Sequence, residues 1–337
     1  MQWVPRSVLE SPAPPDLADR EAGCGRASAK LILFGEHVVL YGKPAISLPV
    51  PSLPVTAEAR RWDGPVVVRS SPLDTGRSTP AAPSRRDASA LTRLAVSVVC
   101  ENLGLPDDGL FVSVDSGIPA GRGFGSSAAS SAAIIRAVAG VSGRTLDHDT
   151  MFALIQRSEA FAHGKASGVD ARTVISAGGP IWFQGGAATP LTVPTGESAP
   201  VLVVADTGVY GSTREAVALV RERVTELGTA GQDLLDRAGT ITSAAATDLT
   251  AARFAALGEK MTAAHDILAQ LGVSCPEIET LVAAALDANA LGAKLSGGGL
   301  GGCVIALAAD PEAAVRLEGA LAAAGAQRCH TVPLGPI

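Results

Sequence analysis

Ile118-Pro119-Ala120-Gly121-Arg122-Gly123-Phe124-Gly125-Ser126-Ser127-Ala128-Ala129 is the most informative stretch of the chain. Three glycines alternate with other residues, two serines follow, and the small residues 128–135 are typical of a helix. Upstream, residues 110–114 alternate apolar and polar side chains as a strand does. Glycine lets the backbone turn sharply, and the unpaired N–H groups at a helix start suit phosphate oxygens. The stretch therefore predicts a strand, an anion-binding loop and a helix.

This prediction has an alternative, because the glycine spacing matches neither the Walker loop nor the Rossmann dinucleotide loop. Glycines in such a turn can serve packing alone. Two further stretches bear on the choice between these interpretations, and both are described below.

Composition narrows the class of protein. The chain has 337 residues, enough for two domains with a sizeable core, and its 47% hydrophobic and 18% charged residues indicate a globular fold. A net charge of −6 and an aromatic content of 4% argue against nucleic-acid binding.

The five cysteines form no Cys-x-x-Cys pair, so neither a disulfide framework nor a zinc site is expected. No apolar run approaches the roughly 20 residues of a membrane helix, and we expect a cytoplasmic protein without a membrane partner.

The N-terminal region contains the second informative stretch. Residues 1–27 hold several prolines without any hydrophobic period, and we expect a flexible tail there. Residues 30–46 then place Gly35-Glu36-His37 between two apolar runs, with Lys30 at the start of the first. These charged groups either line the mouth of a cleft or are simply solvated at the ends of a strand.

The remaining chain predicts further elements. Helices are expected over 90–103 and 151–161, and the second of them contains Glu159. Asp170 follows a turn of small residues, where it is either a functional acid or the N-cap of the next helix. A change in composition at 195–199 predicts a domain boundary. Beyond it we expect a strand at 201–206, three helical segments over 215–272, and a glycine loop that enters the strand 303–307. That loop has a flexible linker as its alternative.

Residues 30–46, 119–129 and 294–307 together resemble the three motifs of the GHMP small-molecule kinases, in the same order. Ser167-Gly168-Val169-Asp170 and Asp206-Thr207-Gly208 are similar to the mevalonate kinases in particular. The resemblance covers about residues 28–335. It implies a two-domain α+β fold, with a ribosomal-protein-like α/β domain at 28–195, a ferredoxin-like α+β domain at 196–337 and the active site in the cleft between them.

The resemblance also implies an activity, the phosphorylation of (R)-mevalonate by ATP with Mg²⁺ in isoprenoid biosynthesis. The alternatives are another GHMP kinase, acting on phosphomevalonate, a sugar or homoserine, and a non-catalytic ligand-binding relative. A homodimer is possible. The matching positions are Asp170 and Lys30 for catalysis, Ser127 and Glu159 for the metal, Glu36, His37 and Thr213 for the substrate, and Pro119, Gly121, Gly123, Gly125, Ser126, Ser127, Gly297 and Gly299 for the nucleotide. Leu300 departs from the family pattern, which has glycine there, and we expect it to add bulk beside the phosphates.

Overall fold

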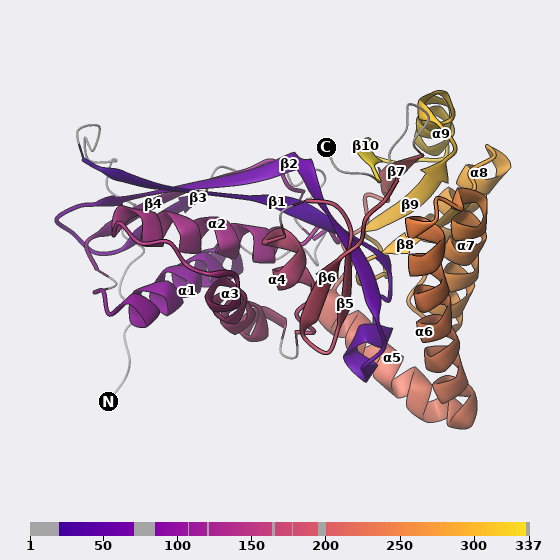
Figure 1. Cartoon of the computed structure of the whole chain (residues 1–337), viewed down its shortest axis with the longest axis horizontal. Helices are drawn as coiled ribbons and strands as arrows, with labels where there is room; N and C mark the ends of the chain where they lie inside the picture. The colour runs from indigo at the N-terminus through magenta and orange to yellow at the C-terminus, as the bar shows by residue number, and fades with distance from the viewer. Residues whose placement is uncertain are drawn as a thin grey trace.

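The computed structural model describes residues 20–70, 85–106, 108–119, 121–163, 166–176, 178–194 and 200–334. Within them the chain forms two sheets, each with its own helices (Figure 1). Most of the expected tail, residues 1–19, and the expected domain boundary at 195–199 lie outside the described residues.

The N-terminal domain is a six-stranded sheet covered by helices on one face, as Figure 1 shows. Two long antiparallel strands dominate it, β1 (Ala22–Phe34) and β2 (Ala45–Arg61), because both alternate inward apolar and outward polar residues. The sheet order beyond β1 is β3 (Val67–Ser70), β4 (Leu110–Ser116), β2, β5 (Ile181–Gln184) and β6 (Ala187–Pro190). Its helices are α1 (Arg85–Leu103), α2 (Ser126–Val141), α3 (His148–His163) and the short α4 (Val169–Val174).

Two boundaries differ from the sequence predictions. Strand β1 begins at Ala22, so the tail expected to reach residue 27 ends earlier. Gly23 and Gly25 lie so close to helix α2 that a Cβ on either would come within 2.1 Å of its backbone. Glycine gives no hydrophobic signal, which is why the alternation of this segment was missed. Helix α1 likewise begins at Arg85, five residues before the expected start.

The C-terminal domain has a ferredoxin-like sheet. Its strands are β7 (Val201–Asp206), β8 (Gly292–Ser296), β9 (Cys303–Ala308) and β10 (Arg328–Pro333), and they pair antiparallel in the order β10-β7-β9-β8. The helices are α5 (Thr213–Leu227), α6 (Thr229–Thr250), α7 (Phe254–Gln270), α8 (Pro276–Asp287) and α9 (Pro311–Ala323). The two-domain α+β prediction is confirmed. Among the described helices, none is long and apolar enough to cross a membrane.

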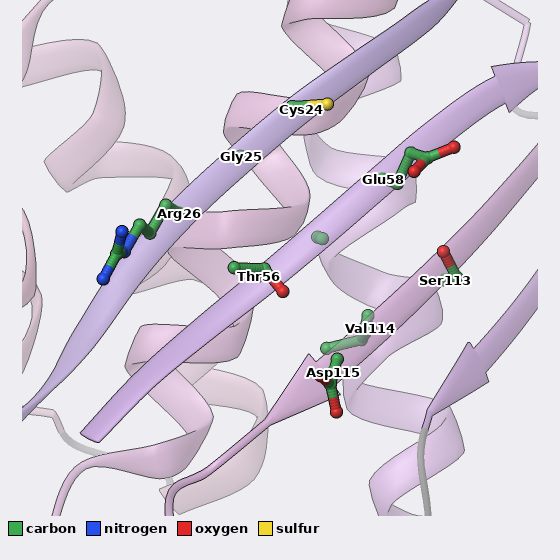
Figure 2. Close-up of a pocket in the computed structure, with 9 residues that line it drawn as sticks. Cys24, Gly25, Arg26, Thr56, Glu58, Ser113, Val114 and Asp115 are labelled. Carbon is green, nitrogen blue, oxygen red and sulfur yellow. The ribbon is translucent and has the colours of Figure 1, made fainter. Parts of the chain in front are cut away.

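The outer face of the N-terminal sheet, which none of the described helices covers, carries a shallow hollow. Figure 2 shows its lining on β1, β2 and β4, with the helices behind the strands. The lining residues are Cys24, Gly25, Arg26, Thr56, Ala57, Glu58, Ser113, Val114 and Asp115. None of them belongs to the predicted site, which lies where the two domains meet.

Candidate active site

Lys30 and Asp170 form an ion pair between strand β1 and helix α4. The Lys30 ammonium lies 2.9 Å from Asp170 Oδ1. The lysine side chain is only 3% exposed, whereas the aspartate is 31% exposed. Gly168, at a φ of +96°, is the N-cap of α4, so Asp170 lies in the first turn and is not the cap. The interpretation of Lys30 as a solvated strand end is therefore wrong, and so is that of Asp170 as an N-cap.

The phosphate loop packs directly against this pair. Gly121, Gly123 and Gly125 all have φ values between +67° and +81°, which favour glycine. The backbone N–H of Lys30 donates to the carbonyl of Phe124 at 2.9 Å. A Cβ on Gly125 would lie 2.7 Å from the Lys30 side chain. The loop glycines are thus required by packing, and their small size also lets the loop contact Lys30.

Helix α2 starts immediately after this loop. Gly125 is its N-cap and, as a glycine, supplies no side-chain hydrogen bond to the backbone N–H groups of the first turn. A 16-residue helix adds a partial positive charge at that end. This arrangement suits an anion, as the sequence predicted.

The third motif is the connection of a β-hairpin. Strands β8 and β9 pair up to Ser296 and Cys303, so residues 297–302 are a tight connection and not a flexible linker. A Cβ on Gly297 would lie 3.1 Å from the Cα of Gly123, and one on Gly123 would lie 2.9 Å from the carbonyl oxygen of Ser296. The two glycine loops, one from each domain, are therefore in direct contact.

Other predicted nucleotide positions lie nearby with different surroundings. Gly299 packs against Val273 of its own domain, and a Cβ on Gly299 would lie 2.2 Å from the Val273 carbonyl oxygen. The ring of Tyr210 covers Gly121, where a Cβ would come within 2.0 Å of it. Pro119 lies in the segment that leads into the loop.

Ser127 and Glu159 also come together. The serine hydroxyl donates to Glu159 Oε2 at 3.2 Å, and the glutamate is 3% exposed. Burial, together with the negative charge of Asp170, raises the pKa of Glu159 to about 7, although the Ser127 hydrogen bond and Lys30 act in the opposite direction. A carboxyl with such a pKa in a site of charged groups is typical of a functional position.

Ser127 and Glu159 offer oxygen donors to a metal ion. Hydroxyl and carboxylate oxygens are what Mg²⁺ prefers, and Mg²⁺ commonly takes one or two protein carboxylates together with substrate phosphates and water. In the described part of the chain, no group of three or more His, Cys, Asp or Glu could hold a metal by itself. Ser127 and Glu159 therefore fit a cation that is shared with a phosphate-bearing ligand.

Two of the three residues predicted on the substrate side, His37 and Thr213, lie beside Gly298. His37 Nε2 donates to the Gly298 carbonyl at 2.8 Å, and a Cβ on Gly298 would lie 3.1 Å from Thr213 Oγ1. Burial lowers the pKa of His37 to about 4. Its Nδ1 is buried and has no hydrogen-bond partner among the described residues. Glu36 differs from the other two because its carboxylate is buried against Lys294 and does not face an open cleft.

Two family models match the chain. The model described as GHMP kinases N terminal domain covers residues 90–179, and the model described as GHMP kinases C terminal covers residues 245–327. The mevalonate kinase of Thermococcus gammatolerans is 35% identical over 312 residues, which span 86% of this chain and 90% of that protein. The mevalonate kinase of Pyrococcus horikoshii is 35% identical over 298 residues, 84% of this chain and 87% of that protein. The chain belongs to the mevalonate kinase family of the GHMP kinases.

The fold agrees with this membership. The crystal structure of L. major mevalonate kinase in complex with R-mevalonate superposes with a TM-score of 0.79, at 27% identity over 94% of this chain and 97% of that chain.

The sequence interpretation missed two ion pairs of this GHMP kinase. Arg122, inside the phosphate loop, lies 3.3 Å from Asp206 at the end of β7, and both side chains are buried. Lys294, on β8, pairs with Glu36. The sequence held a signal for each pair, since Arg122 stands between two glycines of the loop and Lys294 is the one charged residue of strand β8. Neither signal names the partner.

Leu300 of this kinase does not crowd the phosphate loop as expected. Its backbone has a φ of +56°, in the region that favours glycine, and its N–H donates to the Val273 carbonyl at 2.8 Å. The side chain packs against the core of the C-terminal domain. Apolar packing thus offsets the backbone strain at this position.

Proposed function

We propose that this protein transfers the γ-phosphoryl group of ATP to the 5-hydroxyl of (R)-mevalonate, giving ADP and 5-phosphomevalonate. The observation that carries the proposal is the Lys30–Asp170 ion pair, which lies against a glycine loop at the start of a helix. Relatives named mevalonate kinase over most of the chain support the choice of substrate.

Asp170 orients the attacking hydroxyl and accepts its proton. Its carboxylate is about one-third exposed, so a substrate can reach it, and the Lys30 ammonium holds it in place. In a loose phosphoryl-transfer transition state the hydroxyl keeps its proton until late, so positioning is the larger part of this role. The Lys30 ammonium also stabilises negative charge that develops between the hydroxyl and the phosphorus.

The nucleotide phosphates bind at the loop between β4 and α2. Backbone N–H groups of Gly121, Gly123, Gly125, Ser126 and Ser127 donate to phosphate oxygens, with Pro119 shaping the entry to the loop. Gly297 and Gly299 of the facing hairpin complete the cradle. Ser127 and Glu159 would hold Mg²⁺, which neutralises phosphate charge when bound.

Mevalonate binds on the far side of the Lys30–Asp170 pair, between His37 and Thr213. With Nε2–H committed to Gly298, the imidazole offers the lone pair of Nδ1 to a substrate hydroxyl. Thr213, which is exposed at the start of α5, offers its hydroxyl as a second hydrogen-bonding group for the substrate. Glu36 is assigned no contact with the substrate, because Lys294 already occupies its carboxylate.

A substrate panel with Mg·ATP tests this function. We expect kcat/KM for (R)-mevalonate to exceed that for phosphomevalonate, galactose and homoserine by at least a hundredfold. Higher turnover of one of these rivals would reassign the protein within the GHMP kinases, and no turnover of any would favour a ligand-binding relative.

The Asp170→Asn variant tests the assigned chemistry. We expect kcat to fall by about 10²- to 10⁴-fold, while the affinity for an ATP analogue stays within about twofold, because the acid contacts the alcohol and not the nucleotide. Near-parental turnover would remove Asp170 from the mechanism.

A further inference from the structure

The turn that follows β1 is strained. The N–H of Val38 donates to the carbonyl of Glu36 at 2.6 Å, which closes a three-residue γ-turn around His37. His37 has φ +60° and ψ −48°, a conformation that residues with a side chain rarely adopt. Such strain persists only where the surrounding structure holds it, and it is found most often at functional sites.

Two contacts from the other domain hold this turn. The Glu36 carboxylate accepts a hydrogen bond from Lys294 on β8, and His37 donates to Gly298 in the hairpin connection. The Lys294 side chain is 0% exposed and also donates to the Leu295 carbonyl at 2.6 Å. Buried ion pairs are seldom more stabilising than apolar side chains of the same size, so stability alone is a weak reason for this one.

The same hairpin contacts the strand that carries Lys30. Ser296 Oγ donates to the Ile32 carbonyl at 2.8 Å. Lys294 and Ser296 are two residues apart on β8, so both project from the face that meets β1. Beyond them Gly297 rests on Gly123 of the phosphate loop. The hairpin therefore contacts the Glu36–Val38 turn, strand β1 and the phosphate loop through Lys294, Ser296 and Gly297.

We propose that Lys294 is a positioning residue: its ion pair with Glu36 fastens the strained Glu36–Val38 turn to the β8–β9 hairpin and so sets the spacing between the Lys30–Asp170 pair and the hairpin glycines. The inference rests on the proposed function for its kinetic consequence, because that consequence follows only if the hairpin helps to hold the nucleotide. The structural consequence, a hairpin that separates from the turn, does not depend on the substrate.

A double variant, Glu36→Gln with Lys294→Met, removes both charges and leaves no unpaired ion in the interior. We expect it to fold with a Tm within about 5 °C of the parent. Because the hairpin loses its ion-pair attachment to the turn, we expect kcat to fall at least tenfold, with a smaller change in KM for the alcohol.

The matched control is Asp248→Asn with Lys260→Met, which removes a buried acid's charge and its lysine partner between helices α6 and α7 inside the C-terminal domain. The second partner of Asp248, Arg253, is half-exposed and keeps its charge in water. We expect this control to change Tm by a similar amount and kcat by less than twofold. A loss of kcat equal to that of the first variant would overturn the proposal, because it would trace the effect to general destabilisation.

Hydrogen–deuterium exchange separates the positioning role from the reaction itself. In the Glu36→Gln/Lys294→Met variant, peptides over 35–42 and 296–302 should exchange at least tenfold faster than in the parent, while peptides over α9 should be unchanged. Parental exchange in both site peptides, or parental kcat with a folded protein, would overturn the proposal. Should the parent fail to phosphorylate mevalonate, the proposed function fails, and the exchange result still decides whether the pair fastens the turn.

Discussion

At the scale of single residues, the site depends on ionisable groups that are withdrawn from water. Lys30, Glu159 and His37 are each at least 94% buried, with exposed fractions of 3%, 3% and 6%. Burial disfavours the charged form of any group, so it moves the pKa of an acid and of a base in opposite directions. The protonation of Glu159 and of His37 is therefore sensitive to pH in different ranges, and each makes a prediction.

His37 should make the protein less stable in mild acid. Its pKa is lowered to about 4 in the folded protein, whereas the unfolded chain takes up a proton near 6.5. The unfolded state then binds more protons between these values, so stability is full above pH 6.5 and declines as the pH falls toward 4, by up to about 3 kcal/mol.

Urea unfolding of His37→Gln between pH 7.5 and 4.5 measures this contribution. The glutamine amide can still donate to Gly298 but does not titrate, so the variant should lose less stability on acidification than the parent. The matched control, His148→Gln, changes an exposed histidine and should follow the parent. Identical pH slopes for the parent and His37→Gln would contradict the prediction.

Glu159 should couple the magnesium requirement to pH. Its carboxyl has a pKa of about 7 and must lose its proton before it binds a cation. We expect the apparent affinity for Mg²⁺ to weaken about tenfold for each pH unit below 7, and high Mg²⁺ to move the acid limb of the activity profile to lower pH. Magnesium titrations at pH 6, 7 and 8 measure this effect, and a requirement that is constant across that range would remove Glu159 as a ligand.

The raised pKa of Glu159 also affects folding, with the opposite sign to that of His37. The folded protein holds this proton to higher pH than the unfolded chain, whose carboxyl titrates near 4.5. The contribution of this group to stability is therefore present below pH 4.5 and is lost as the pH rises through about 7. A bound cation would remove much of this loss by favouring the ionised form.

At the scale of elements, the start of helix α2 contacts the Lys30–Asp170 pair through its backbone. Gly125 caps the helix with φ +67°, and the Lys30 side chain fills the space where a Cβ would stand. The element thus fixes both the N–H groups of its first turn and the position of the Lys30 ammonium. Its other end has a glycine of similar geometry, Gly143, with φ +65° and open space around it.

Gly125→Ala should therefore reduce catalysis more than stability. We expect kcat to fall by at least tenfold, because the new methyl group displaces Lys30 from Asp170 and small misplacements of reacting groups are costly. Gly143→Ala carries the same backbone strain without the clash, and it should alter Tm by a few degrees and leave kcat unchanged. Equal kcat values for the two variants would show that Lys30 adapts to the added methyl group.

At the scale of the whole molecule, the N-terminal strand ties the first described residues to the core. Gly23 and Gly25 lie against the backbone of α2, and Arg26 accepts a hydrogen bond from Arg136 through its carbonyl. The first residues of β1 are thus a structural part of the N-terminal domain, and removing them should lower the stability of that domain.

Truncation distinguishes this strand from the residues before it. Removing residues 1–25 deletes the first four residues of β1 and exposes α2, so we expect a Tm lower by at least 5 °C or insoluble protein. Removing residues 1–19 leaves β1 whole and serves as the control, with parental Tm and activity expected. A stable and active 1–25 deletion would contradict the importance of this part of the sheet.

Much of this fold and site could be predicted from the sequence because the signals are local. Alternating and helical periods placed most strands and helices, and the glycine-rich stretches identified loops whose backbone conformations few other residues adopt. The start of β1 was missed because its inward positions are glycines, whose packing leaves no hydrophobic pattern.

What the amino-acid sequence determined by itself was the order of elements, the family and the set of residues that could carry chemistry. The tertiary structure decided which of those residues face one another. Glu36 was predicted on the substrate side, yet its partner Lys294 lies 258 positions away in the other domain. A charged residue in an apolar stretch of sequence indicates that its burial needs a partner, but it does not identify that partner. The partner of Glu36 depends on how the two domains pack against each other.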